Sequence, residues 1–246
     1  MWDAIGFGHN DGYSGALAYR GLRNAVALAR DVGDAALAKQ CLAAAERHRV
    51  AMINDLWNPA TGWLAGWRSR DGQLHDYAFV FINAMAACFD MFEPQQAREV
   101  LDRFEAKRKA VGHTDFHFGI APQLESVPKN DLNGFCVARL RTHRRDGRDA
   151  FGILCNGALT PCWAYYYTRA LSKFGFTQTA DQICEQLLDG FERGVFEGLW
   201  NGTEAWIWDG FAGGYEGTLA HSYYPLLAMA QHRGWIQARD PEFWPG

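Results

Sequence analysis

The sequence lacks several features that would assign it to a class at once. Its 6 cysteines form no CxxC pair, and no Gly-rich phosphate loop follows a strand, because no strand–loop–helix unit is predicted. No run approaches the ~20 apolar residues that a membrane span requires. The start, Met1-Trp2-Asp3, has neither the basic nor the apolar region of a signal peptide. We therefore expect a cytoplasmic protein with buried free thiols and no membrane partner.

Strong charge is also missing. The 24 basic and 28 acidic residues give a net charge of −4, which offers no electrostatic reason to expect nucleic acid as a partner. The HxDxH segment at residues 113–117 has the residue types of a metal site. Since no further ligand pair is evident, we expect neither a metal nor a cofactor.

Aromatic residues, in contrast, are plentiful. They make up 14% of the chain and include 10 Trp, several of which lie in Gly-rich connections rather than in helices. An aromatic face stacks well on the apolar face of a sugar ring, and Trp adds an N–H donor. The alternative is that these rings only plug the ends of a helical assembly. The Trp residues concerned are Trp63, Trp67, Trp200, Trp206 and Trp208.

Three stretches repeat one plan, in which two amphipathic helices are followed by a long Trp/Gly-rich connection. Such repetition is typical of stacked helical hairpins. Residues 76–92 are apolar all round and predict a buried helix, whereas residues 95–107 carry charges on one face. We therefore predict a single all-α domain over residues 1–246, with inner and outer helices. The predicted helices are 14–32, 35–56, 76–92, 95–107, 158–173, 178–194 and 217–231.

Four segments resemble the later hairpins of six-hairpin glycosidases, specifically bacterial enzymes related to α-glucosidase I, mannosylglycerate hydrolase and trehalase. They are HNDGYSGALAYRGL (9–22), LWNPATGWLAGWRSRDG (56–72), NGALTPCWAYYYTRAL (156–171) and GGYEGTLAHSYYPLLA (213–228). The resemblance implies an (α/α) toroid, of which this chain supplies about three and a half hairpins out of six. It would thus be the C-terminal part of a barrel. The missing hairpins would be on another chain or be replaced by self-association.

The resemblance further implies a glycoside hydrolase that acts on α-linked glucosides or mannosides. Such enzymes place two carboxyl groups across the scissile bond, and a separation of ~6.5–9.5 Å suits inversion. The family usually has its base as a Glu in the C-terminal part, where Glu216 and Glu204 are the candidates. Glu216 could instead stabilise the first turn of a helix, and Glu204 could be an exposed loop carboxylate.

The general acid is sought among Asp11, Asp115, Glu125 and Asp131. Asp131 and Glu125 lie in the long connection 112–154, where burial against apolar side chains would raise the pKa of a carboxyl group. Asp131 is the leading candidate, although the sequence alone does not select the acid. Asp11 precedes the first helix and could simply cap it.

Residues at the helix mouths and in the Trp-rich connections are predicted to bind the sugar. His75 and Asp76 precede the apolar helix and suit sugar hydroxyl groups, with N-capping by Asp76 as the alternative. The full predicted set is Asp11, Trp67, His75, Asp76, Trp206, Trp208 and Tyr215.

Two other functions are compatible with the same fold. In a sugar epimerase or isomerase, His would replace a carboxylate as proton carrier, and His9, His75 or His221 would converge on a pocket. In a non-catalytic carbohydrate- or protein-binding module, the carboxylates would be caps and the Trp residues packing.

Overall fold

The computed structural model describes residues 5–133, 151–152, 156–194, 203–208, 211–216 and 219–237, with the backbone alone for 203–207, 211–216 and 219–222. The described part is mainly helical, as predicted, with short antiparallel strands between the helices. Its α-helices are α1 (Gly12–Asp31), α2 (Ala35–Leu56), α3 (Val80–Cys88), α4 (Pro94–Ala110), α6 (Ala164–Lys173), α7 (Thr177–Glu192) and α8 (Leu219–His232). The 3-10 helices η2 (Lys129–Asp131) and η3 (Pro161–Trp163) lie in the connections.

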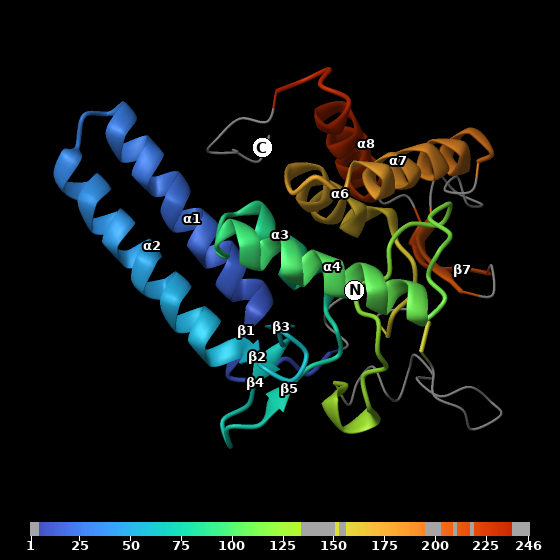
Figure 1. The fold of residues 1–246 in the computed structure, drawn as a ribbon, viewed down its shortest axis with the longest axis horizontal. Coiled ribbons are helices and arrows are strands. Elements are labelled where there is room, and N and C mark those ends of the chain that lie inside the picture. The colour runs from blue at the N-terminus through green and yellow to red at the C-terminus, as the bar shows by residue number, and fades with distance from the viewer. Residues whose placement is uncertain are drawn as a thin grey trace.

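The helices form consecutive hairpins. α1 packs on α2, α3 contacts α4, and α6 packs on α7. The first member of each pair also contacts the next: α1 meets α3, α3 meets α6, and α6 meets α8. Figure 1 shows the α1–α2 pair at the left, α3 and α4 in the middle, and α6, α7 and α8 at the right. The predicted hairpin repeat is thereby confirmed for the described residues.

Local signals account for the helix ends. Asp34 caps α2 by accepting a hydrogen bond from the backbone N–H of Leu37 at 2.9 Å, as its residue type favours. Gly33 turns the chain between α1 and α2 with a φ of +78°, a conformation that Gly adopts without steric cost. As a result, α2 has the predicted bounds.

The core lies along the first helices of the pairs. Eight of the nine residues of α3 are buried. The prediction that this apolar segment is an inner helix is therefore confirmed. α6 is also largely buried, through its tyrosines and small residues. α4 and α7 each bury one face and expose a charged one.

α3 begins at Val80, four residues later than predicted. Asp76 accepts a hydrogen bond from the N–H of Ala78 at 3.0 Å, and Ala78 has a left-handed φ of +54°. Phe79 then forms an isolated antiparallel bridge with Gln123. These contacts keep residues 76–79 out of the helix, so the apolar run starts as a bridge and only then becomes a helix.

Within the described ranges, seven short strands lie in the connections. They are β1 (Asn10–Asp11), β2 (Trp57–Asn58), β3 (Trp63–Leu64), β4 (Trp67–Arg68), β5 (Leu74–His75), β6 (Thr203–Ile207) and β7 (Phe211–Glu216). β4 lies between β1 and β5, β2 pairs with β3, and β6 pairs with β7, all antiparallel. β1–β5 gather at one end of the α1–α2 pair (Figure 1). The Trp/Gly-rich connection between α2 and α3 therefore contains four of these short strands.

Two further expectations concern the whole chain. Among the helices of the described residues, none combines the length and the apolar character needed to cross a membrane. Four cysteines are described as free thiols, and of these Cys184 is fully buried whereas Cys41, Cys88 and Cys162 are partly buried. Burial raises the pKa of the Cys184 thiol to about 11, so it remains protonated and unreactive at neutral pH.

Candidate functional site

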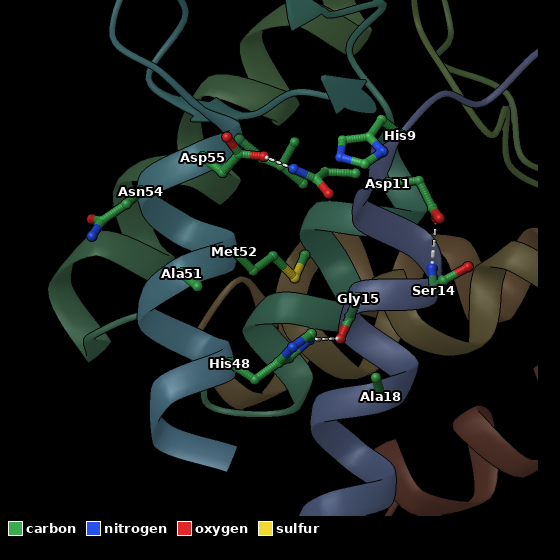
Figure 2. A pocket seen from close by; sticks show the side chains of 12 residues that line it. His9, Asp11, Ser14, Gly15, Ala18, His48, Ala51, Met52, Asn54 and Asp55 are labelled. Carbon is green, nitrogen blue, oxygen red and sulfur yellow. Dashed lines mark hydrogen bonds between the residues drawn. The ribbon is translucent and has the colours of Figure 1, made fainter. Parts of the chain in front are cut away.

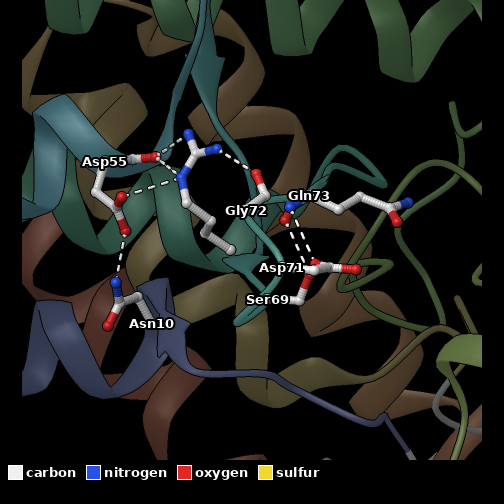
Figure 3. Close-up of polar contacts among 7 residues, drawn as sticks. Asn10, Asp55, Ser69, Asp71, Gly72 and Gln73 are labelled. Carbon is white, nitrogen blue, oxygen red and sulfur yellow. Dashed lines mark hydrogen bonds and ion pairs between the residues drawn. The ribbon is translucent and has the colours of Figure 1, made fainter.

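The β4–β5 hairpin forms one wall of the candidate site. Its turn is closed by a hydrogen bond from the N–H of Ser69 to the carbonyl of Gln73 at 2.9 Å, and Gly72 takes a φ of +89° there. The Asp71 carboxylate accepts hydrogen bonds from the Ser69 hydroxyl and the Gln73 N–H. The Ser69 bond holds the pKa of Asp71 below its usual value. These contacts can be followed in Figure 3.

His75, at the end of β5, lies at the centre of a cluster formed with Trp67, Ser69, Tyr77 and Asp131. Its Nδ1 is 2.6 Å from Oδ2 of Asp131, and its Nε2 is 3.1 Å from the Ser69 hydroxyl oxygen. The ring stacks on the indole of Trp67 with centroids 4.5 Å apart. Only 8% of the His75 side chain is exposed.

Asp131 ends η2 and brings the central connection to this hairpin. Its Oδ2 accepts a hydrogen bond from the Tyr77 hydroxyl and lies 2.6 Å from Nδ1 of His75. Burial, followed by the Asp131 carboxylate, raises the pKa of Tyr77, so the phenol stays protonated and donates. The Asp131 side chain is 17% exposed, which leaves part of it accessible.

This arrangement joins the central connection to the β4–β5 hairpin. One carboxyl oxygen of Asp131 meets both His75 and Tyr77, and part of the side chain is exposed. The role of Asp131 as the general acid stays a prediction.

Two of the predicted sugar-binding residues have other contacts. Trp67 is 1% exposed and packs between His75 and Phe7, so it has no open face for a sugar. Asp76 accepts hydrogen bonds from Asn58, Thr61 and Trp63 as well as from Ala78. The structure thus assigns Trp67 to packing and Asp76 to fixing the start of α3.

Asp11 has the capping role that was the alternative for it. Its carboxylate accepts a hydrogen bond from the N–H of Ser14 at 2.7 Å. It also lines a cavity of about 710 Å³ between α1 and α2, which Figure 2 shows from close by. The lining residues are His9, Asn10, Asp11, Ser14, Gly15, Ala18, His48, Ala51, Met52, Asn54, Asp55 and Leu56.

The carboxylates and His48 of this cavity are engaged in holding the two helices and the sheet together. Asp55 accepts hydrogen bonds from Asn10 at 2.9 Å and from Arg68 at 3.0 Å (Figure 3). His48 Nε2 is 2.8 Å from the carbonyl oxygen of Gly15. Both side chains therefore have their contacts within the fold. We therefore place the candidate catalytic site at Asp131 and not in this cavity.

The remaining predicted carboxylates lie on the β6–β7 hairpin. Thr203 pairs with Glu216, and an irregularity follows between Thr203 and Ala205. Glu204 and Glu216 thus occupy neighbouring positions on adjacent strands. Their side chains, and those of Trp206, Tyr215 and His221, lie outside the described residues. Whether any of them meets Asp131 stays a prediction.

Trp208 follows β6 and is partly buried. Its indole N–H donates to the carbonyl of Gly157 at 2.7 Å, and its ring packs against Phe151 and His113. The N–H is therefore used within the fold, and the predicted role of Trp208 at a sugar subsite is limited to its ring.

The two histidines of the HxDxH segment have different partners within the fold. His113 is buried and its Nε2 accepts a hydrogen bond from the N–H of Ala121 at 3.3 Å. His117 contacts Asp115 and lies 3.0 Å from Asp189 of α7. Among the described residues, no group of three or more His, Cys, Asp or Glu side chains could hold a metal ion. Glu125, another acid candidate, pairs with Lys107.

Sequence reasoning missed Ser69 and Tyr77 as members of the cluster. Tyr77 lies in a bend after the end of β5, so strand periodicity in the sequence does not link it to His75. No signal links residue 131 to residue 75 either.

The paired helices and their order define a class: the chain has part of a six-hairpin, glycosidase-like fold. One similar solved structure is GH63 mannosylglycerate hydrolase from Thermus thermophilus in complex with glucose. It is 14% identical with a TM-score of 0.59, and the match covers 92% of this chain and 48% of that chain. The same hydrolase in complex with Tris and D-glycerate gives 15% identity, a TM-score of 0.60, and 89% and 45% coverage.

A further match is a sialidase, with 14% identity and a TM-score of 0.61, covering 97% of this chain and 21% of that chain. The chain therefore spans less than half the length of these solved chains. At such identities the likeness shows the fold alone. No protein-family model matches the sequence, and no curated protein does.

Proposed function

We propose that this chain is part of a glycoside hydrolase that cleaves α-linked glucosides or mannosides with inversion. The observation that carries the proposal is the likeness, over 92% of the chain, to a mannosylglycerate hydrolase in complex with glucose. The partly exposed Asp131 carboxyl group, in contact with His75 and Tyr77, supports it from within the chain.

In the proposed reaction, Glu216 or Glu204 is the base. It removes a proton from a water molecule, whose oxygen attacks the anomeric carbon on the face opposite the leaving group. Asp131 is the acid that protonates the departing glycosidic oxygen. The rings of Trp206, Trp208 and Tyr215 are proposed to border the sugar.

We further propose that the toroid is incomplete in this chain and is completed by hairpins of another chain or by self-association. The series of neighbouring helices α1, α3, α6 and α8 exposes apolar side chains at both of its ends, which supports this proposal. Leu28 of α1 and Val32, which directly follows α1, are 50% and 78% exposed, and Leu226 of α8 is 44% exposed. Light scattering on the purified chain tests self-association, and Leu28→Glu with Val32→Glu is expected to prevent it. A strictly monomeric wild-type chain would argue for a different partner.

The experiment is a screen of the purified chain against α-glucosides and α-mannosides, with the anomer of the product read by NMR. Asp131→Asn, Glu204→Gln and Glu216→Gln are compared with wild type, and Asp102→Asn, an exposed carboxylate of α4, is the matched control. In a glycosyl fluoride the leaving group is the fluoride ion, which departs without protonation. A variant of the general acid therefore keeps activity on this substrate, whereas a variant of the general base does not.

The outcomes separate the roles. Asp131→Asn is expected to lose activity on glycosides but to keep it on the fluoride, while Asp102→Asn retains both activities. Loss of fluoride hydrolysis by Asp131→Asn would contradict its role as the acid. A folded wild-type chain that hydrolyses no glycoside would remove the hydrolase proposal for the chain on its own.

A further inference from the structure

The exposed large apolar side chains of this protein gather at the two ends of the helix series. Nine such side chains are exposed in the part of the chain that the structure describes, and none of them lies on α3, α4 or α6. The middle of the series is therefore covered by neighbours, whereas both ends expose apolar surface (Figure 1). The nine are Leu28, Val32, Leu37 and Val50 at the α1–α2 end, and Leu188, Tyr223, Leu226, Trp235 and Ile236 at the α7–α8 end.

The first of these ends is the face of α1 that is turned away from α3. α1 uses a different face to meet α3, where Arg20 lies over the ring of Phe89. The cavity of about 710 Å³ opens on the uncovered side, since Ala18 of α1 and Ala51 of α2 line it and are exposed (Figure 2). Small side chains let a neighbouring helix approach closely. Exposed residues recur at helical spacing along this face of α1: Ser14, Ala18, Gly21 and Leu28.

Contacts between helix ends show how one member of the series is placed beside the next. Lys173, the last residue of α6, donates to the backbone carbonyl of Cys88, the last residue of α3, at 3.2 Å. His232, the last residue of α8, lies 2.9 Å from the hydroxyl oxygen of Ser172 in α6. The C-terminal ends of α3, α6 and α8 are therefore level. A further α1 helix placed beside α8 would continue the series.

The two ends also carry opposite charge. α1 and α2 together have six Lys or Arg and three Asp or Glu side chains. α7 has four carboxylates and neither Lys nor Arg. Two arginines that follow α7 and α8, Arg193 and Arg233, pair with carboxylates of α7, which leaves an excess of two negative charges from the four. Complementary charge favours contact between unlike ends over contact between like ends.

We propose that two copies of this chain close a ring head to tail, in which the α7–α8 end of each copy packs on the exposed α1–α2 face of the other. The inference rests on the proposal that the toroid is incomplete in this chain, and it names the partner and the two surfaces. The match covers 48% of the similar hydrolase chain, so two copies supply about the length of one such chain. A ring of two contains the same contact twice and leaves neither end open.

Single substitutions at each end test the two surfaces. Wild type, Leu28→Glu, Leu226→Glu and the control Ala106→Glu, at an exposed alanine of α4, are compared by light scattering over a range of concentrations. Wild type and the control are expected to have twice the mass of one chain. Each end variant should dissociate, with Kd raised roughly 100-fold or more, because both contacts of the ring would bury an unpaired charge.

An equimolar mixture of Leu28→Glu and Leu226→Glu distinguishes unlike ends from like ends. The α1–α2 face of Leu226→Glu and the α8 end of Leu28→Glu are both unchanged, so one of the two contacts is intact in a mixed pair. A heterodimer should therefore form at concentrations where each variant alone is monomeric. A contact between like ends would leave one variant dimeric on its own, and mixing would restore nothing. Either of these results would overturn the inference.

The measurement of mass needs no substrate, so it is separate from the test of hydrolysis. A dimeric wild type that hydrolyses no glycoside leaves the ring in place and removes the hydrolase proposal. A folded, monomeric wild type overturns the ring and leaves completion of the toroid by a different chain. A mass that keeps rising with concentration overturns it as well, because it shows an open row of copies. If circular dichroism shows that Leu226→Glu is unfolded, Trp235→Glu, at a side chain that is 75% exposed, takes its place.

Discussion

Trp67 and His75 are cross-strand partners whose rings stack with their planes 7° apart. The register of the β4–β5 hairpin therefore sets the position of the imidazole. A slip by one residue would turn His75 to the other face of the hairpin and break its contact with Asp131. The short strands of this protein thus matter more for the candidate site than their length suggests.

The buried ion pair between Glu105 and Arg108 ties three helices together. Glu105 accepts hydrogen bonds from Arg108 at 2.7 and 3.0 Å, and also from Tyr167 of α6 and Thr179 of α7. Glu105→Ala would leave the guanidinium buried without its partner. We expect the free energy of unfolding in urea to fall by about 3–5 kcal/mol, whereas the exposed control Asp102→Ala should change it by less than about 0.5 kcal/mol.

Stability should also depend on the ionisation of His113. Burial, with Arg108 nearby, lowers the pKa of this imidazole to about 3, against about 6.5 in an unfolded chain. Between these values the unfolded chain binds a proton that the folded one does not. Acidification from pH 6.5 towards pH 3 therefore destabilises the fold, by up to about 1.4 kcal/mol per pH unit from this group.

His113→Gln keeps an acceptor for the N–H of Ala121 and removes this titration. The variant should lose less stability than wild type when urea unfolding is repeated between pH 6.5 and pH 4.5. Equal slopes for the two proteins would contradict the prediction.

Asp76 is predicted to act on stability and not on substrate binding. Asp76→Ala removes the acceptor of four donor groups and should cost about 2–4 kcal/mol of unfolding free energy. Thr61→Val removes one donor, 3.0 Å from the carboxylate, and should cost about 1 kcal/mol. Thermal unfolding measures both. A raised KM in a stable Asp76→Asn variant would restore the sugar-binding role.

Gly119 and Gly33 form a matched pair of backbone positions. Both have positive φ values, +109° and +78°, but a Cβ at Gly119 would lie 2.2 Å from the carbonyl carbon of Thr160, whereas one at Gly33 would meet nothing within 4 Å. We expect Gly33→Ala to cost about 1 kcal/mol. Gly119→Ala should cost about 3 kcal/mol or more, because the backbone must move as well. Similar losses in urea unfolding would contradict this steric account.

The sequence predicted the helices best where local signals mark their ends. α2 was predicted with its observed bounds, because Asp34 caps its start and Asn58-Pro59 closes the pair. α3 was predicted too long, since the residues that keep 76–79 out of the helix are distant: Trp63 donates a hydrogen bond to Asp76, and Gln123 forms a bridge with Phe79. Helical periodicity carries no information on such contacts.

The candidate site was predicted residue by residue, but its geometry could not be. Trp67, His75 and Asp131 were each named from the sequence, and the structure brings all three together. What the sequence missed was direction. The ring nitrogens of His75 point to Asp131 and Ser69, so its expected contact with substrate is replaced by contacts within the protein.

The 3-10 helix that carries Asp131 is also tied to the segment before α1. The N–H of Gly6 donates to the carbonyl of Asp131 at 2.7 Å, and Ile5 bridges Leu132. Closing a long stretch of chain costs entropy before the contact stabilises anything, and non-local contacts of this kind form slowly. The hairpin helices can thus form early in refolding, whereas the carboxylate reaches its place only when two remote segments meet. Recovery of activity should lag behind recovery of helix.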